Sequence, residues 1–187
     1  MIVPAILITF LPLNPVSDAG DDGVATTLTE PNWQVPGGET DWSFIVVHHS
    51  GTRSGSVSSI HRNHRSRKDA YGQPWLGIGY HFVIGNGNGQ ADGLIKATFR
   101  WEQQIHGAHS GNAVYNARGV GICLIGNFQD SKPSPRQMES LTQLIRTISK
   151  RHNIPADRII GHSDIKATAC PGRHLLLDDV RRTVNNR

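Results

Sequence analysis

Residues 44–50 read Phe-Ile-Val-Val-His-His-Ser, and the rest of the predicted fold is arranged around them. Four successive aromatic or β-branched residues predict a buried strand. Neighbouring side chains of a strand face opposite sides, so only one of the two histidines at its end can point into a given cleft. His48 and His49 are therefore expected to have different roles.

Outward from this strand, the chain alternates strand and helix signals. Further strands are expected at residues 80–84, 120–125 and 158–161, the last at a sheet edge. The Asn-Gly units at 85–89 predict a hairpin turn rather than a phosphate loop, because no helix follows them. Strands mixed with helices predict a single α/β domain with a central mixed sheet flanked by helices.

Three helices are expected. Ser56 and Ser134 are N-cap candidates, and Ser134 opens a Ser-Pro-x-Gln capping box before apolar residues at three- and four-residue spacing. Asn153 is expected to end that helix. From Pro171 a last helix is expected to carry Leu176 on its apolar side.

Residues 1–40 are predicted to be a leader or signal-like segment with a linker, before a folded domain at 41–187. Residues 2–13 are almost wholly apolar but fall short of the ~20 residues that cross a bilayer, so no transmembrane anchor is expected. A small-x-small site follows at 17–19, although no basic residue precedes the run. We expect a cell-envelope or secreted location; a cytoplasmic one stays open, as does cleavage of the segment.

The charge balance favours an anionic partner. The net charge of +4 and the pI near 9.4 suit nucleic acid, a lipid surface or an acidic cell-wall polymer. No aromatic residues interleave the densest basic cluster for base stacking, which argues against nucleic acid. We expect this basic cluster to be a solvated helix face; it consists of Arg62, Arg65, Arg67 and Lys68.

His162 and Cys170 lie on one expected loop, which can bend both toward one ion. Imidazole and thiolate are ordinary zinc ligands, and three protein ligands with a fourth position left open characterise catalytic zinc. The helix expected after Cys170 would favour its thiolate through the positive end of the helix dipole. Taken singly, a histidine is more often a hydrogen-bonded residue, and a cysteine such as Cys123 is more often packed in the interior.

Four blocks, at residues 45–50, 79–84, 119–128 and 161–172, resemble the type 2 N-acetylmuramoyl-L-alanine amidases in content and order. That family includes the phage T7 lysozyme and the animal peptidoglycan recognition proteins. The likeness covers residues 42–175, nearly the whole expected domain. It implies the amidase fold, one zinc ion, and hydrolysis of the amide between N-acetylmuramic acid and L-alanine in peptidoglycan.

Carried over position by position, the resemblance makes His48, His162 and Cys170 the metal ligands. Tyr80 falls at the catalytic centre as the group that orients water or donates to the oxyanion. Thr168 falls there too, at a position where some relatives carry lysine, so hydrogen bonding without a fixed charge is expected of it.

The resemblance also implies substrate contacts and partners. His109 and Asn116 fall in a loop that helps to wall the family's substrate groove, so they are expected to contact the peptide or the muramyl sugar. The expected partners are peptidoglycan or muropeptides, without nucleic acid, and the chain is expected to be a monomer. The alternative is a module that binds peptidoglycan without cutting it; loss of a metal ligand is the expected mark, and this sequence keeps all three.

Overall fold

The computed structural model of the chain describes residues 33, 35, 38–69 and 71–185. The apolar run at 2–13 and the small-x-small site at 17–19 lie outside these residues, as does the expected leader up to residue 32. No helix in the described part of the chain is long and apolar enough to cross a bilayer.

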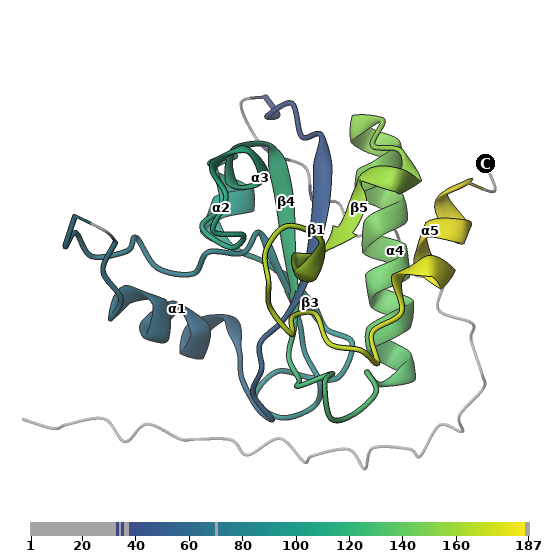
Figure 1. The fold of residues 1–187 in the computed structure, drawn as a ribbon, viewed down its shortest axis with the longest axis horizontal. Coiled ribbons are helices and arrows are strands. Elements are labelled where there is room, and N and C mark those ends of the chain that lie inside the picture. The colour runs from purple at the N-terminus through teal and green to yellow at the C-terminus, as the bar shows by residue number, and fades with distance from the viewer. Residues whose placement is uncertain (1–32, 34, 36–37, 70, 186–187) are drawn as a thin grey trace, which may run out of the picture. The chain divides into compact units, whose positions relative to one another are not determined.

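A five-stranded mixed sheet forms the centre of the fold, in the order β3-β2-β4-β1-β5 (Figure 1). Its strands are β1 (Phe44–His49), β2 (Phe82–Ile84), β3 (Ile95–Ala97), β4 (Gly119–Leu124) and β5 (Ile159–Gly161). β1 runs parallel to both β4 and β5, β4 runs parallel to β2, and β3 is antiparallel to β2. Parallel strands covered on both faces read as nearly continuous apolar runs, as β1 and β4 do.

Within the described residues, five α-helices and two 3-10 turns join these strands. They are α1 (Val57–Arg65), α2 (Phe99–Glu102), α3 (Ala113–Arg118), α4 (Pro135–His152), η1 (Ala156–Arg158), η2 (His162–Asp164) and α5 (Leu177–Asn185). Figure 1 shows α4 and α5 together on one side of the sheet, with α1 on the other side. Two helices, α4 and α5, thus cover one face of the sheet, and α1 lies on the other.

The two faces of the sheet have different coverings. Ile45 and Val47 of β1 and Ile122 of β4 belong to the main core, together with Leu141 of α4. Because alternate side chains of a strand point to opposite faces, His48 points away from this core. His48 therefore lies on the face of the sheet that points away from α4.

The structure confirms the predicted α/β fold with its central mixed sheet, the hairpin and the short edge strand β5. β2 is shorter than expected, because it begins at Phe82 and leaves Tyr80 in the segment before it. Gly87 and Gly89, in the β2–β3 connection, have φ values of +89° and +94°. This left-handed backbone explains why glycine occurs at these two positions.

Helix α4 forms as the capping box predicts. The Ser134 hydroxyl accepts a hydrogen bond from the Gln137 N–H at 3.0 Å, and the Gln137 side chain accepts one from the Ser134 N–H at 3.2 Å. The Gln137 amide also donates to the Ile125 carbonyl at 2.8 Å, which ties the start of α4 to the end of β4. Asn153 ends the helix in the left-handed conformation, with a φ of 52°.

The expected start of the last helix is wrong. Helix α5 begins at Leu177, six positions later than predicted, and Leu176 is 62% exposed. A helix cannot run through Gly172, because its φ is +100°. An added Cβ there would lie 2.3 Å from the Phe128 backbone, so glycine is needed at this position. Cys170 therefore does not lie at the N-terminus of a helix, and the predicted help of a helix dipole to its thiolate form is wrong.

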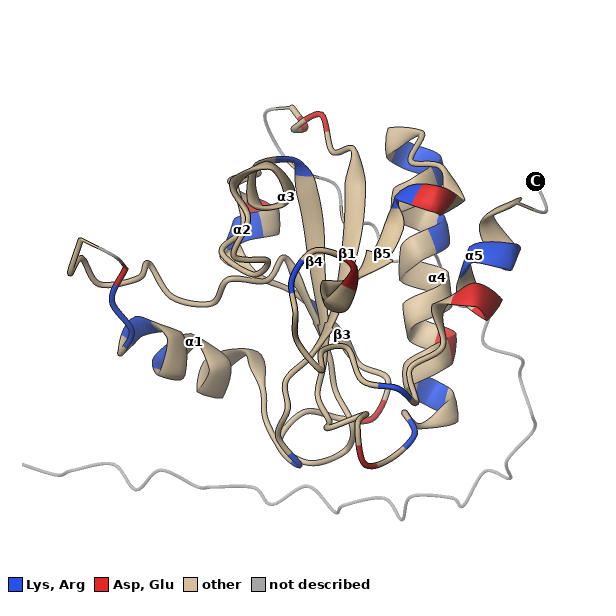
Figure 2. Cartoon of the chain, viewed as in Figure 1, with Lys and Arg blue, Asp and Glu red and all other residues tan. Residues whose placement is uncertain are grey.

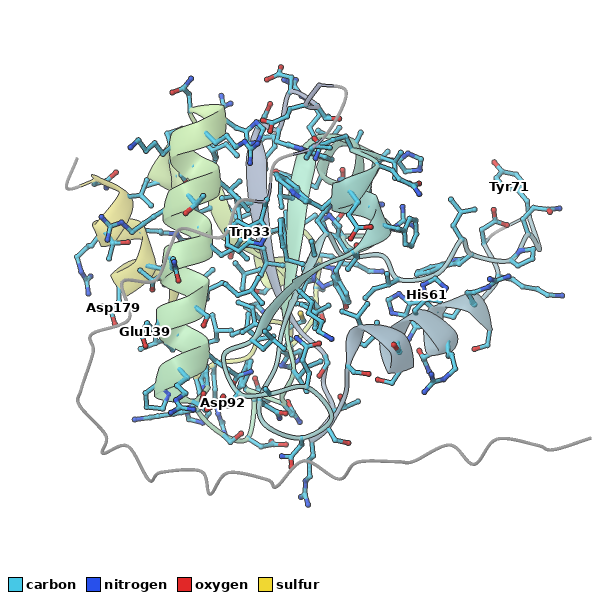
Figure 3. The ribbon with its side chains drawn as sticks, turned by 180° about the vertical axis from the view of Figure 1, so that it is seen from behind. Trp33, His61, Tyr71, Asp92, Glu139 and Asp179 are labelled. Atoms are coloured by element: carbon cyan, nitrogen blue, oxygen red, sulfur yellow. The ribbon has the colours of Figure 1, made fainter. Side chains whose placement is uncertain are left out.

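The basic cluster is exposed to solvent, as predicted, at the end of α1 and in the segment that follows (Figure 2). The Arg67 guanidinium lies 5.6 Å from the centre of the Trp75 ring. Tyr71, which is 88% exposed, lies at the outer end of the same segment (Figure 3).

Part of the expected linker contacts the domain. The Trp33 carbonyl accepts hydrogen bonds from the Trp101 indole at 3.2 Å and from the Arg151 guanidinium at 2.9 Å. Glu39 forms an ion pair with Arg151. The domain boundary at residue 41 stays a prediction.

Replacing Ser134 with alanine is expected to lower the free energy of unfolding by about 1 kcal/mol, because the N-cap hydroxyl of α4 is lost. Urea denaturation of the two proteins measures the difference. Ser58→Ala, at an exposed position inside α1, is the matched control, with a change within about 0.5 kcal/mol. Equal losses in the two variants would rule out the capping role.

Candidate metal centre

Three side chains from distant parts of the chain converge on one point. One ring nitrogen each of His48 and His162 and the sulfur of Cys170 all lie within 4.8 Å of one another. His48 Nδ1 is 3.7 Å from Cys170 Sγ, and the two imidazole centroids are 4.6 Å apart. The predicted convergence of these positions is confirmed, while their role as metal ligands stays a prediction.

The sheet explains how the two histidines meet. β1 and β5 are parallel neighbours with Val47 paired to Gly161, so His48 and His162 follow at the same carboxyl end of the sheet. The Gly161 N–H donates to the Asp164 carboxylate at 2.9 Å, which shapes η2. The sheet edge therefore sets the spacing of the two imidazoles.

Cys170 returns to this edge at the end of the loop that follows η2. An added Cβ on Gly161 would lie 2.9 Å from the Pro171 ring, so glycine allows this close approach. The His49 N–H donates to the Cys170 sulfur at 3.3 Å. The His49 ring is turned elsewhere, since its Nδ1 accepts from the Phe128 N–H at 3.1 Å. His49 is thus outside the cluster, as the alternation of side chains predicts.

The pKa shifts of the three side chains bear on whether they can bind a cation. Burial raises the pKa of the Cys170 thiol to about 11, although the hydrogen bond from the His49 backbone opposes this shift. Burial, and then the neighbouring His109 and His162, lower the pKa of His48 well below its usual range. Burial also lowers the pKa of His162. The imidazoles are therefore neutral, as metal ligands must be, and a thiolate here needs a positive partner.

Tyr80 lies beside the cluster. Its ring centroid is 5.1 Å from that of His48. Burial, followed by the adjacent Cys123 and Cys170, raises the pKa of the Tyr80 hydroxyl well above its usual range, so the hydroxyl keeps its proton. Cys123 is fully buried, which confirms its predicted packing in the interior.

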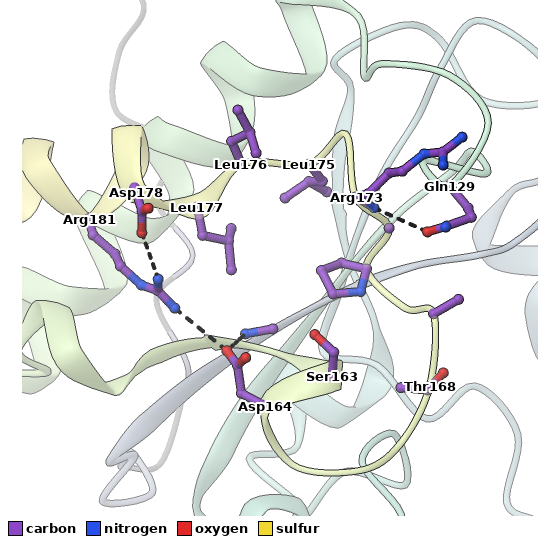
Figure 4. A pocket seen from close by; sticks show the side chains of 14 residues that line it. Gln129, Ser163, Asp164, Thr168, Arg173, Leu175, Leu176, Leu177, Asp178 and Arg181 are labelled. Atoms are coloured by element: carbon purple, nitrogen blue, oxygen red, sulfur yellow. Dashed lines mark hydrogen bonds and ion pairs between the residues drawn. The ribbon is translucent and has the colours of Figure 1, made fainter.

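Thr168 occupies the loop before Cys170. Its hydroxyl accepts a hydrogen bond from the Cys170 N–H at 3.3 Å. It also lines an open pocket of about 410 Å³ between this loop and the start of α5, with Ser163, Arg173 and Arg181 among the other lining residues (Figure 4). None of the three cluster side chains lines this pocket. The catalytic role of Thr168 stays a prediction.

His109 and Asn116 have partners inside the chain. His109 is only 8% exposed, and its two ring nitrogens lie 3.0 Å from His48 Nε2 and 3.2 Å from the Gly119 carbonyl. The Asn116 side-chain oxygen accepts hydrogen bonds from the backbone N–H groups of His109 and Ser110 at 3.0 and 2.9 Å. Their contact with substrate stays a prediction; in the structure His109 is buried against His48, and Asn116 is half-buried and bonded to the His109–Ser110 backbone.

His64 is a site neighbour that the sequence analysis missed. Its Nδ1 accepts a hydrogen bond from the Gly79 N–H at 3.1 Å, and its ring centroid is 5.7 Å from that of Tyr80. Burial, and then Arg67 and Arg100, lower the pKa of His64 to about 4. A neutral His64 thus holds the segment that carries Tyr80. Its position among the basic residues of α1 provided no signal of this role.

Comparison with known proteins leads in the same direction. The family profile described as N-acetylmuramoyl-L-alanine amidase matches residues 38–173. A peptidoglycan-recognition protein of Drosophila simulans is 33% identical over 141 residues, covering 71% of this chain and 69% of that protein. The endolysin of Enterobacteria phage T3 is 31% identical over 132 residues, covering 68% and 78%.

The fold matches as well. The solved structure of the N-acetylmuramoyl-L-alanine amidase LysC from Clostridium intestinale URNW superposes with a TM-score of 0.65 at 30% identity, covering 79% of this chain and 87% of that one. Sequence and structure comparisons thus point to one family.

The lowered pKa of His64 predicts acid sensitivity. An unfolded histidine takes up its proton near pH 6.5, whereas folded His64 does so only near pH 4, so the stability from neutral His64 is lost as the pH falls between these values. His64→Asn, which keeps an acceptor for the Gly79 N–H, is expected to reduce the proton uptake on unfolding in this range by up to about one proton.

Urea denaturation of metal-free wild type and His64→Asn at several pH values measures this uptake. Values at neutral pH separate lost packing from the pH slope. Identical slopes for the two proteins would be incompatible with the role given to His64.

Proposed function

Because the chain belongs to the N-acetylmuramoyl-L-alanine amidase family, we propose that it hydrolyses the amide between N-acetylmuramic acid and L-alanine in peptidoglycan, using one zinc ion. The observation that carries the proposal is the cluster of His48, His162 and Cys170 on the sheet face opposite α4. Peptidoglycan or muropeptides are the proposed substrates, because the similar proteins are named for peptidoglycan recognition and for lysis.

The donor set fits zinc. Two imidazole nitrogens and one sulfur suit a borderline-soft ion, and three protein ligands are typical of catalytic zinc. Zinc–nitrogen and zinc–sulfur bonds of about 2.0–2.1 and 2.3 Å place a tetrahedral nitrogen and sulfur roughly 3.5–3.6 Å apart. The 3.7 Å between His48 Nδ1 and Cys170 Sγ is close to that spacing.

When bound, zinc supplies Lewis-acid chemistry, polarising an amide carbonyl and making a water molecule more acidic. The chain's own residues provide the rest. Tyr80 keeps its hydroxyl proton because of its raised pKa, so it can donate to the oxyanion that forms at the scissile carbonyl. Thr168 uses an oxygen lone pair for the Cys170 N–H and retains its own proton for a substrate oxygen.

A non-catalytic peptidoglycan-binding role is the second candidate. The 33% identity to a protein named for peptidoglycan recognition supports it. Retention of all three donor side chains favours the enzyme, because a pure binding module does not need them. Binding of muropeptides without release of stem peptide would decide for the second candidate.

Defined muropeptides incubated with the protein are expected to release free stem peptide, detected by mass spectrometry. A chelator should abolish release and added zinc should restore it, because the ion would supply the Lewis acid. In Cys170→Ala the rate of stem-peptide release is expected to fall more than about 100-fold, a larger fall than the loss of an outer-shell partner causes.

Cys123→Ala is the matched control for the loss of a buried thiol, and it should retain one zinc per chain. Equal rates of release from Cys170→Ala and wild type would refute the proposal.

Tyr80→Phe is expected to lower turnover by about 10²–10³, the usual effect of removing one oxyanion donor, with zinc content unchanged. Turnover of the same muropeptides and metal analysis of the purified variant provide the test. Wild-type turnover in Tyr80→Phe would remove Tyr80 from the catalytic centre.

A further inference from the structure

The dipeptide His109–Ser110 contacts both histidines of the cluster, in each case at the ring nitrogen Nε2. His109 Nδ1 lies 3.0 Å from His48 Nε2, and the Ser110 carbonyl lies 3.1 Å from His162 Nε2. The Nδ1 atoms of both imidazoles are thus left for the space they share with Cys170.

Backbone carbonyls, which can only accept hydrogen bonds, determine which ring nitrogen of each histidine carries the hydrogen. A carbonyl cannot donate, so His109 Nε2, 3.2 Å from the Gly119 carbonyl, must carry a hydrogen. Burial keeps the His109 ring neutral. Its Nδ1 therefore has a lone pair, and His48 donates to it through Nε2–H. His48 Nδ1 is therefore a lone pair, and it faces the Cys170 sulfur at 3.7 Å.

The same logic applies to His162. Its Nε2 must donate to the Ser110 carbonyl, which leaves a lone pair on Nδ1. Both imidazoles are thereby held as the same tautomer, and both present Nδ1. A ligand histidine whose other ring nitrogen donates to a fixed acceptor is oriented and made more basic.

The dipeptide is itself held by Asn116. The Asn116 side-chain oxygen accepts from the His109 N–H, the Ser110 N–H and the Ser110 hydroxyl, at 3.0, 2.9 and 2.9 Å. The Asn116 carbonyl accepts from the Gly107 N–H at 2.8 Å, which fixes the loop before the dipeptide. A single amide oxygen thus organises the segment that contacts both histidines.

Two glycines make room for the His109 ring. A Cβ added to Gly107 or Gly121 would lie 2.3 or 2.5 Å from the ring of His109. Gly121 is in the middle of buried strand β4, where glycine weakens a strand. The two glycines thus leave the room that the His109 ring occupies beside His48.

We propose that His109 and Ser110 form the outer shell that fixes His48 and His162 as Nε2–H tautomers, with Nδ1 toward the ion, and that Asn116 positions this pair. The inference rests on the metal role in the proposed function. It reassigns His109 and Asn116 from substrate contact to positioning, because both ring nitrogens of His109 and the side-chain oxygen of Asn116 already have partners inside the chain.

Nitrogen NMR of the metal-free protein at neutral pH reads the histidine tautomers directly. Wild-type His48 and His162 are expected as Nε2–H forms. In His109→Phe, His48 is expected to populate both tautomers, and zinc affinity, measured by competition with a chelator, should fall about 10–100-fold. His109→Gln, which keeps one acceptor and one donor, should recover part of that affinity.

Asn116→Leu and Asn116→Asp form an independent pair in case His109→Phe does not fold. The Asn116→Asp variant keeps the accepting oxygen and so should keep most of the zinc affinity, whereas Asn116→Leu should lose affinity as His109→Phe does. His152→Phe, at a histidine on α4 whose ring faces Trp101, controls for loss of an imidazole elsewhere.

Wild-type His48 in the Nδ1–H form, or undiminished zinc affinity in folded His109→Phe, would overturn the inference. A protein that binds zinc in this way but releases no stem peptide would sink the proposed hydrolysis and leave the positioning role intact. The two failures are therefore distinguishable.

Discussion

The parallel pairing of β1 between β4 and β5 determines where the two histidines of the candidate metal centre can lie. Parallel neighbours end at the same edge, so His48 and His162 meet although they are far apart in sequence. The two-residue period of β1 turns His48 away from the core that Val47 enters. The sheet thereby separates the apolar core, on the face that α4 covers, from the polar cluster on its other face.

That polar centre combines neutral imidazoles with a buried thiol. Burial raises the pKa of the Cys170 thiol to about 11, and the hydrogen bond from the His49 backbone opposes this shift only in part. Deprotonated sulfur at such a depth is favourable only beside a positive charge. A divalent cation satisfies the thiolate and both Nδ1 lone pairs at once, which is why the chemistry of the donors and their burial lead to the same conclusion.

Much of the fold was predictable because its signals are local. The strand over 44–49 follows from four apolar residues in a row, and α4 follows from the Ser134 capping box. The absence of a helix at Pro171 was not predictable, since Gly172 has a φ of +100° and packs against the Phe128 backbone, a contact between distant residues. For the site, residue type, loop position and family likeness pointed to the three donors. The partner of His48 did not follow from them, because His109 lies 61 positions away and reaches it only through the fold.

X-ray absorption at the zinc edge identifies the atoms bound to the ion. It therefore tests directly whether His48, His162 and Cys170 bind zinc. We expect one zinc per chain, with one sulfur at about 2.3 Å and two histidine nitrogens at about 2.0–2.1 Å. Cys170→Ala should lose the sulfur signal. A zinc shell without sulfur, or one that is the same in wild type and Cys170→Ala, would show that these three side chains do not hold the metal.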